Sequence, residues 1–160
     1  ADAIQIGARN MQNFHLLKEA GKTNMPVLLK RGFASTVEEW LKAAEYVASN
    51  DNLNIILCER GIRTFGDELR FTPDLGIVPA VQKLSHLPIL VDPSHSTGKR
   101  HLVGPVARAG VAVGADGVMV EVTPDPESAM CDSSQQMSPD GFEDLMEQIR
   151  QVASAIGASA

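Results

Sequence analysis

Three cationic side chains, Arg9, Lys30 and Arg60, each come shortly after a short apolar segment of the sequence. Three cations brought to one place repel each other unless an anion lies among them. A phosphate or carboxylate ligand meets this need, and arginine can hold it with two parallel hydrogen bonds. The alternative is that each cation pairs with a nearby acid, such as Arg60 with Glu59. Three cations at equivalent positions favour the anion site.

A histidine and two carboxylates form a second set of candidate residues. His95 and Glu121 follow two later apolar segments, and Asp132 lies in the stretch after Glu121. An imidazole with two carboxylates suits a divalent Mn, Fe, Co or Zn ion, and three ligands leave room for a fourth protein group or for substrate. The spacing alone fits equally well with a helix-capping Asp132, a structural His95 and an exposed Glu121.

The cysteines and the other histidines are weaker candidates. Cys58 closes an apolar segment and is expected in the core, where free cysteine is common. Cys131 adjoins Asp132, and adjacent residues rarely aim at one ion. We expect the three remaining histidines at the surface or at helix ends; they are His15, His86 and His101.

The candidate residues need elements that bring them together, and the chain alternates short apolar segments with longer amphipathic ones. The apolar segments are Ala3–Ile6, Val27–Leu29, Ile55–Leu57, Ile89–Val91 and Val118–Val120. Segments this short and apolar are typical of parallel strands buried on both faces. Helices are predicted over Met11–Ala20, after a capping box at Thr36–Glu39, over Leu75–Leu84 and Leu102–Val113, and after Ser138, with Pro139 in first position.

The order strand–helix repeats five times, which predicts the α/β class with a parallel sheet. All the candidate residues near strand ends then face one rim, where both barrels and open α/β sheets hold their active sites. An open sheet would more often show a glycine-rich phosphate loop, and neither GxGxxG nor GxxxxGK[ST] is present. The pattern therefore favours a (β/α) barrel.

Composition limits the function classes. The 160 residues include 20 acidic and 14 basic side chains, a formal net charge of −6, so we expect no nucleic-acid partner. No stretch approaches the ~20 apolar residues of a membrane span, and the first residues show no signal-peptide pattern. Two cysteines without CxxC spacing suggest reduced thiols in the cytoplasm.

We expect one domain over residues 1–156 and a flexible tail over 157–160.

Several motifs together closely resemble 3-deoxy-D-arabino-heptulosonate 7-phosphate synthases of type I beta. They are Gln5–Asn10 (QIGARN), Leu29–Gly32 (LKRG), Cys58–Thr64 (CERGIRT), Asp92–His95 (DPSH), Met119–Glu121 (MVE) and Asp132–Gln136 (DSSQQ). They follow the family order over nearly the whole chain. The sister synthases that make 3-deoxy-manno-octulosonate 8-phosphate share the Cys-Glu-Arg-Gly and Asp-x-x-His elements but lack Gly-Ala-Arg-Asn, which leaves them as the alternative.

The resemblance implies a cytoplasmic transferase, a dimer or tetramer of identical chains, that joins phosphoenolpyruvate to erythrose 4-phosphate and releases phosphate in the first step of the shikimate pathway. By resemblance Arg9, Lys30 and Arg60 grip phosphoenolpyruvate, and Arg63, Thr64 and Ser96 lie near the second substrate. Likewise His95, Glu121 and Asp132 are three of four ligands of Mn²⁺, Fe²⁺, Co²⁺ or Zn²⁺. Lys30 and His95 are the expected catalytic residues, with Lys30 a candidate proton donor to the forming alkoxide.

The family fold is a (β/α)8 barrel of roughly 250 residues, and this chain supplies five C-terminal βα units. The first three strands are missing from the pattern, and with them the metal-binding cysteine and the Lys-Pro-Arg-Thr element of the family. Neither Cys58 nor Cys131 matches that cysteine. Three hypotheses follow: an enzyme active in the complete barrel, an inactive anion-binding module, or a segment that folds against a partner. An isolated five-unit piece would expose two sheet edges.

Overall fold

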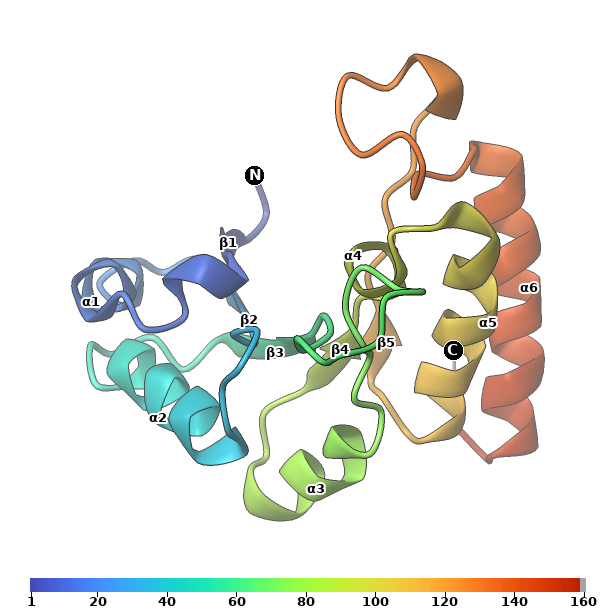
Figure 1. Cartoon of the computed structure of the whole chain (residues 1–160). Helices are drawn as coiled ribbons and strands as arrows, with labels where there is room; N and C mark the ends of the chain where they lie inside the picture. Colours follow the sequence, from blue (N-terminus) through green and yellow to red (C-terminus); the bar gives the residue numbers. More distant parts are fainter. Residues whose placement is uncertain (159–160) are drawn as a thin grey trace.

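The computed structural model describes residues 1–158. Five strands form one parallel sheet in the order β1-β2-β3-β4-β5. The strands are β1 (Ile4–Ile6), β2 (Val27–Lys30), β3 (Ile55–Glu59), β4 (Ile89–Val91) and β5 (Gly117–Val118). In Figure 1 they follow an arc, with helices along its outer side. A parallel sheet in chain order with a helix after each strand is the arrangement of a (β/α) barrel, which confirms the predicted fold class.

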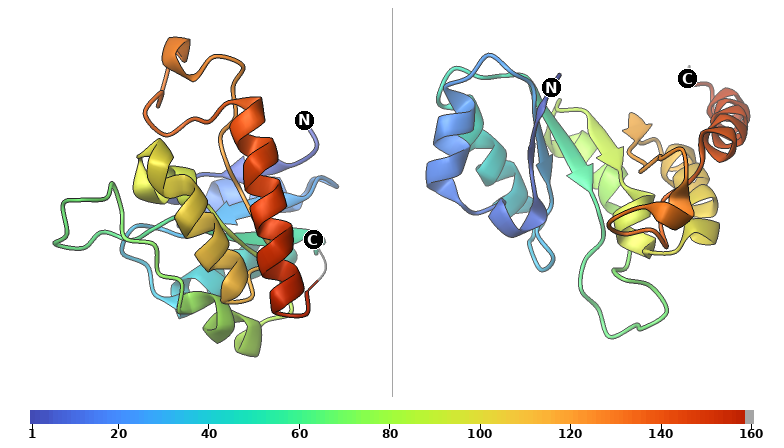
Figure 2. Two further views of the ribbon diagram at one scale, coloured as in Figure 1. Left: turned by 90° about the vertical axis from the view of Figure 1, so that its right-hand side faces the viewer. Right: turned by 90° about the horizontal axis from the view of Figure 1, so that it is seen from above.

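Helices connect and cover the strands. The helices are α1 (Phe14–Gly21), α2 (Val37–Ala48), α3 (Ile77–Leu84), α4 (Pro93–Thr97), α5 (Arg100–Ala112) and α6 (Pro139–Ala155), with 3-10 turns η1 (Ala8–Asn10) and η2 (Pro126–Ser128). Figure 2 shows α1 and α2 at one end of the sheet and α5 and α6 at the other. The predicted Thr36 capping box and the Ser138 cap are both present.

Three local features differ from the sequence prediction. Helix α1 begins at Phe14 rather than Met11, because the Asn13 side chain caps it by accepting a hydrogen bond from the Leu16 amide. The short helix α4 was not predicted, since its five residues follow β4 after Asp92 alone and are too few to show a helical pattern. Strand β5 ends at Val118, two residues earlier than expected.

The core lies between the sheet and the outer helices. Alternate strand residues such as Leu29, Leu57 and Val91 are fully buried and pack with Trp40 of α2. The Trp40 indole N–H donates to the Leu29 carbonyl at 3.2 Å, which fixes α2 on β2. Because strand side chains alternate between faces, Lys30 extends from the opposite, concave face.

The two ends of the arc are open within residues 1–158. Strand β1 pairs only with β2, and β5 pairs only with β4. A groove of about 750 Å³ lies beside β5, lined mainly by apolar side chains of α5, β5 and α6. The amides of Gly157 and Ala158 bond to carbonyls at the end of α6. The rest of the predicted tail, residues 159–160, lies outside the described part of the chain. No described helix combines the length and apolarity needed to span a membrane.

Candidate active site

A buried ion pair joins two strands at their carboxyl ends. Lys30 is the last residue of β2, and Asp92 directly follows β4. The Lys30 ammonium lies 2.8 Å from Asp92 Oδ2, and both side chains are almost completely buried. The same carboxylate oxygen lies 2.8 Å from His95 Nδ1. Asp92 therefore holds a cation and an imidazole at one point of the rim.

The protonation state of Asp92 fixes the orientation of His95. Burial on its own would raise the pKa of Asp92, but the hydrogen bond from His95 and the charge of Lys30 outweigh burial and lower it. An ionised Asp92 accepts a hydrogen bond from Nδ1–H, and this contact directs Nε2 away from Asp92. His95 Nε2 lies 3.4 Å from Glu121 Oε1 and is free to act as a metal ligand.

The metal-ligand candidates meet in space. Atoms of His95, Glu121 and Asp132 lie within 4.8 Å of one another, a spread that one divalent ion can bridge. Nitrogen and carboxylate oxygen donors suit Mn, Fe, Co or Zn, so the donor set fits such an ion. Asp132 has a φ of +49°, a left-handed conformation that aspartate tolerates better than most residues. Cys58 is buried in β3 and Cys131 is exposed, and neither belongs to this cluster of described residues.

Arg60 is buried, yet its guanidinium lacks ordinary partners. Its Cζ lies 4.2 Å from the Phe71 ring centroid and 4.8 Å from that of Phe33. Its Nη1 is buried, with no hydrogen-bond partner in the part of the chain that the structure describes. Burial lowers the pKa of Arg60, although arginine still keeps its charge. A buried donor without an acceptor is rare and indicates a place for an anion.

The pairing of Arg60 with Glu59, which the sequence left open, does not occur. Glu59 Oε2 instead accepts from Arg31 at 2.9 Å, and its Oε1 accepts from the Gly61 amide at 2.6 Å. Arg31 also bonds to Asp74 at 2.9 Å. Two arginines at the ends of neighbouring strands thus have different surroundings, because acids satisfy Arg31 and aromatic rings enclose Arg60.

The structure places the other candidate residues as follows. Arg9 is exposed, and its Cζ lies 5.4 Å from the Phe33 ring, so Arg9 and Arg60 approach the same ring. Arg63 is exposed, and its amide donates to the Phe33 carbonyl. The Thr64 hydroxyl lies 2.6 Å from that of Thr72. The Ser96 side chain is fully buried and its hydroxyl donates to the Pro93 carbonyl, so it is turned away from the surface.

Sequence reasoning missed two residues that contact the metal-ligand candidates. Arg70 Nη1 donates to Asp132 Oδ1 at 3.0 Å and to Gln135 Oε1 at 3.2 Å. Gln135 Nε2 then donates to Glu121 Oε2 at 2.6 Å. Gln135 is buried, and the only sequence signal for it is its place in the Asp132–Gln136 motif.

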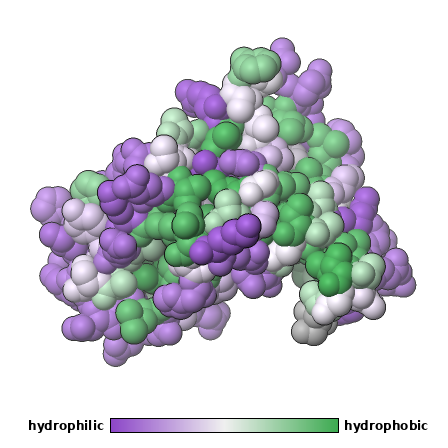
Figure 3. Space-filling model, turned by 90° about the horizontal axis from the view of Figure 1, so that it is seen from below, coloured by the Kyte–Doolittle hydropathy of each residue, from purple (hydrophilic) through white to green (hydrophobic). Residues whose placement is uncertain are grey.

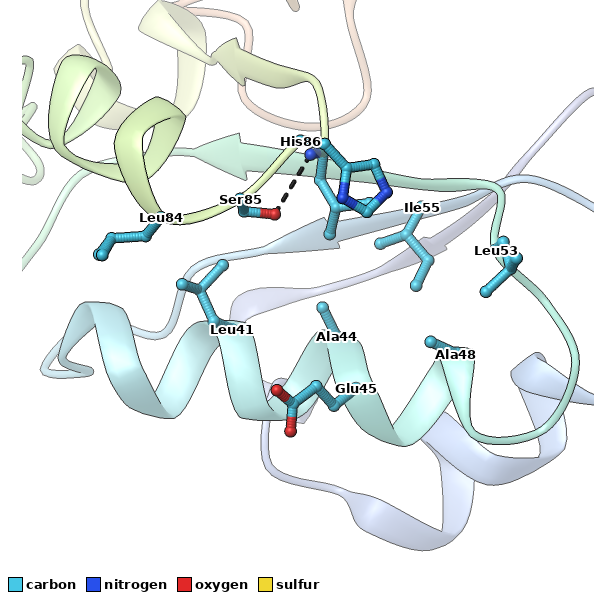
Figure 4. A pocket seen from close by; sticks show the side chains of 10 residues that line it. Leu41, Ala44, Glu45, Ala48, Leu53, Ile55, Leu84, Ser85 and His86 are labelled. Atoms are coloured by element: carbon cyan, nitrogen blue, oxygen red, sulfur yellow. Dashed lines mark hydrogen bonds between the residues drawn. The ribbon is translucent and has the colours of Figure 1, made fainter.

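An apolar pocket of about 220 Å³ lies at the other end of the strands, between α2 and the end of α3 (Figure 4). Leu41, Ala44, Ile55 and Leu84 line it, among others. Figure 3 shows hydrophobic side chains gathered between hydrophilic ones on the lower face of the molecule. Since Ile55 begins β3 and Lys30 ends β2, this pocket is separate from the polar rim.

A parallel βα sheet with cations and a His/Glu/Asp set at its carboxyl ends is the arrangement found at the active-site rim of (β/α)-barrel enzymes. A model of the DAHP synthetase I family matches residues 1–158, and the chain belongs to this family. The resemblance inferred from the motifs is thereby confirmed.

Individual relatives agree with the family assignment. Phospho-2-dehydro-3-deoxyheptonate aldolase of Thermotoga maritima is 57% identical over 157 residues, which cover 98% of this chain and 46% of the relative, in its C-terminal part. A 2-dehydro-3-deoxyphosphooctonate aldolase of Geobacter sulfurreducens is 30% identical, over 94% of this chain and 58% of its own length.

Solved structures show the same fold. The crystal structure of the Thermotoga maritima DAHP synthase matches with a TM-score of 0.97 and 56% identity, covering 99% of this chain and 47% of that chain. A truncated form of the synthase from the same organism matches with a TM-score of 0.96 and is covered to 61%. The chain thus spans about half the length of the curated relatives it matches.

Proposed function

We propose that this chain is the phosphoenolpyruvate- and metal-binding part of a 3-deoxy-7-phosphoheptulonate synthase, a cytoplasmic enzyme of aromatic amino acid biosynthesis. The observation that carries the proposal is Asp92, which bonds both to Lys30 and to His95. Lys30 belongs with Arg9 and Arg60 to the cation group, and His95 belongs with Glu121 and Asp132 to the metal-ligand group. The site therefore combines a place for an anion with a place for a divalent ion. The higher identity to the heptonate enzyme, 57% against 30%, favours it over the octonate enzyme.

Phosphoenolpyruvate is the anion that the cation group would hold. The guanidinium groups of Arg9 and Arg60 both lie near the Phe33 ring. Lys30 lies at the end of β2, next to the end of β3 that Arg60 follows. A phosphate or carboxylate oxygen would accept a hydrogen bond from Arg60 Nη1, and its negative charge would offset the repulsion among the cations. Such positioning of the substrate and neutralisation of its charge are the main contribution of this chain's residues to catalysis.

His95, Glu121 and Asp132 would hold the divalent ion, with Mn²⁺, Fe²⁺, Co²⁺ and Zn²⁺ as the candidates. When bound there, such an ion supplies Lewis-acid polarisation of the aldehyde oxygen. In the overall reaction a carbon–carbon bond forms between the enol carbon and the aldehyde carbon, water is consumed and phosphate leaves. Lys30 Nζ lies 3.5 Å from His95 Nδ1, close enough to the metal-ligand group to donate a proton to the forming alkoxide.

The proton-donor role of Lys30 has its own test. A Lys30→Arg variant keeps the positive charge, but its guanidinium does not release a proton in the accessible pH range. We expect it to change the pH–rate profile on the alkaline side. An unchanged profile would reject Lys30 as the donor and leave it as an anion-binding residue.

Activity is proposed for the complete barrel, in the form of a dimer or tetramer of identical chains. The relatives are about twice as long as the match, and the free edges of β1 and β5 are where further strands of a barrel would pair. The segment from 1 to 158 by itself is proposed to bind the anion and the ion weakly and to catalyse nothing.

The test measures the intact mass of the natural gene product and its phosphate release with phosphoenolpyruvate, erythrose 4-phosphate and Mn²⁺. Metal-dependent turnover that EDTA abolishes would support the synthase. An octonate product needs a five-carbon aldose phosphate, because phosphoenolpyruvate contributes three carbons; faster turnover with that substrate would favour the alternative. A mass near 17 kDa without turnover would favour a binding module that requires a partner.

A further inference from the structure

Two consecutive residues of the β3–α3 loop, Arg70 and Phe71, sit in a slot formed by two glycines. Gly61 and Gly98 both have left-handed backbones, with φ of +92° and +67°. A Cβ on Gly61 would lie 2.6 Å from the Phe71 Cβ, and one on Gly98 would lie 2.9 Å from the Arg70 Cβ. These distances are too short for real carbon contacts, so only glycine leaves room for the pair.

The backbone of this pair is fastened to the segment that carries His95. The Arg70 amide donates to the Thr97 carbonyl at 3.2 Å, and the Phe71 amide donates to the Ser96 carbonyl at 2.7 Å. Because Ser96 and Thr97 belong to α4, the loop cannot shift without moving the helix that presents His95.

The two side chains diverge toward different parts of the site. The Phe71 ring lies against the Arg60 guanidinium at 4.2 Å and stacks on Phe33 with 4.6 Å between ring centroids. The ring thereby forms one wall of the part of the site that holds Arg60 Nη1, the buried nitrogen without a hydrogen-bond partner among the described residues. A cation held against a ring in a buried site loses rotational freedom without losing its hydrogen-bonding capacity.

The Arg70 side chain extends the other way, to both carboxylates of the metal-ligand group. It bonds directly to Asp132 and, through the buried amide of Gln135, to Glu121. Each carboxylate keeps one oxygen that these contacts do not use. Outer partners of this kind fix the direction of a ligand before the ion arrives.

We propose that the Arg70–Phe71 pair positions both halves of the site at once. Phe71 sets the Arg60 guanidinium for phosphoenolpyruvate, and Arg70 with Gln135 sets Asp132 and Glu121 for the divalent ion. This inference rests on the proposed function, because it assigns to these residues the positioning of its substrate and its metal. The pair acts through other residues and does not itself react.

Two binding measurements on the complete gene product separate the two arms. Phosphoenolpyruvate binding is measured by calorimetry in EDTA, and Mn²⁺ binding is measured without substrate from the paramagnetic resonance signal of free Mn²⁺. Phe71→Leu is expected to weaken phosphoenolpyruvate binding about fivefold and to leave Mn²⁺ binding unchanged. Gln135→Leu and Arg70→Met are each expected to weaken Mn²⁺ binding about tenfold, and Gln135→Leu leaves phosphoenolpyruvate binding unchanged.

Matched controls and conservative variants keep the test decisive. Phe65→Leu changes an exposed ring of the same loop, and Gln151→Leu changes an exposed amide of α6; neither should affect either affinity. Phe71→Tyr keeps the ring and should bind as the wild type does. If circular dichroism shows that Phe71→Leu is unfolded, Phe33→Leu tests the same stack from its other ring. Gly98→Ala, which crowds Arg70, should weaken Mn²⁺ binding.

The outcomes distinguish this inference from the function on which it rests. A wild-type protein that binds neither ligand would reject the proposed function. A wild-type protein that binds both, with unchanged affinities in Phe71→Leu and Gln135→Leu, would overturn the positioning role alone. Tighter Mn²⁺ binding in Arg70→Met would also overturn it, because Arg70 would then compete with the ion for Asp132.

Discussion

The ammonium of Lys30 lies 2.8 Å from the carboxylate of Asp92, although β3 separates the strands that present them. Their side chains meet over the concave face of the sheet, which the outer helices do not cover. Both groups are buried, so salt ions in the solvent screen the attraction between them only weakly. The same carboxylate orients His95, and the pair therefore connects the cation group with the metal-ligand group.

Replacing one member of this pair should destabilise the protein strongly. Asp92→Asn leaves the Lys30 ammonium buried without its counter-charge, and breaking a buried pair in this way costs about 3–5 kcal/mol. We expect the free energy of unfolding, measured by urea denaturation of the complete gene product, to fall by that amount. The double variant Lys30→Met/Asp92→Asn should cost less than the sum of the two single changes. Strict additivity would show that the two residues do not interact.

Replacing Arg60 should lower the activity of the protein without lowering its stability. Its Nη1 is buried without a partner, so the folded protein bears a desolvation cost of about 1–3 kcal/mol at this group. Arg60→Met removes that cost and keeps the contact with Phe71. We expect a melting temperature equal to or above that of the wild type, with kcat/KM for phosphoenolpyruvate about 100-fold lower. A large loss of stability with intact activity would mean that Arg60 is a structural residue.

The local features of the fold were predictable because they depend on neighbours in sequence. The alternation of apolar and amphipathic segments identified all five strands, and the Thr36 and Ser138 caps mark where α2 and α6 begin. Helix α4 was missed because five residues give no periodicity. It exists because Asp92 caps it by accepting from the His95 amide and Pro93 begins it.

The partners of the charged side chains could not be read from the sequence. Glu59 and Arg60 are adjacent at the end of an extended strand, where successive side chains point to opposite faces. Glu59 therefore pairs with Arg31 of the neighbouring strand end rather than with Arg60. Arg70 and Asp132 are far apart in the chain and meet only because the sheet brings the loops after β3 and β5 together.

The assignment of the metal ligands makes a direct prediction for His95. His95→Ala removes a nitrogen donor from the cluster of three candidate ligands. We expect Mn²⁺ affinity in the complete gene product to fall by more than the roughly 100-fold that loss of an outer partner can cause. His101→Ala is the matched control, because His101 is exposed on α5. Equal Mn²⁺ affinity in the two variants would reject His95 as a ligand.

The two cysteines should differ sharply in reactivity. Cys58 is fully buried in β3, and burial together with the charge of nearby Asp92 raises the pKa of its thiol, whereas Cys131 is exposed. Since the thiolate is the reactive form, alkylation of the native protein should label Cys131 and spare Cys58. Peptide mass spectrometry after labelling at pH 8, with a urea-unfolded sample as the control, measures both sites separately. Labelling of Cys58 as fast as Cys131 in the native protein would mean that the β3 strand end opens readily to solvent.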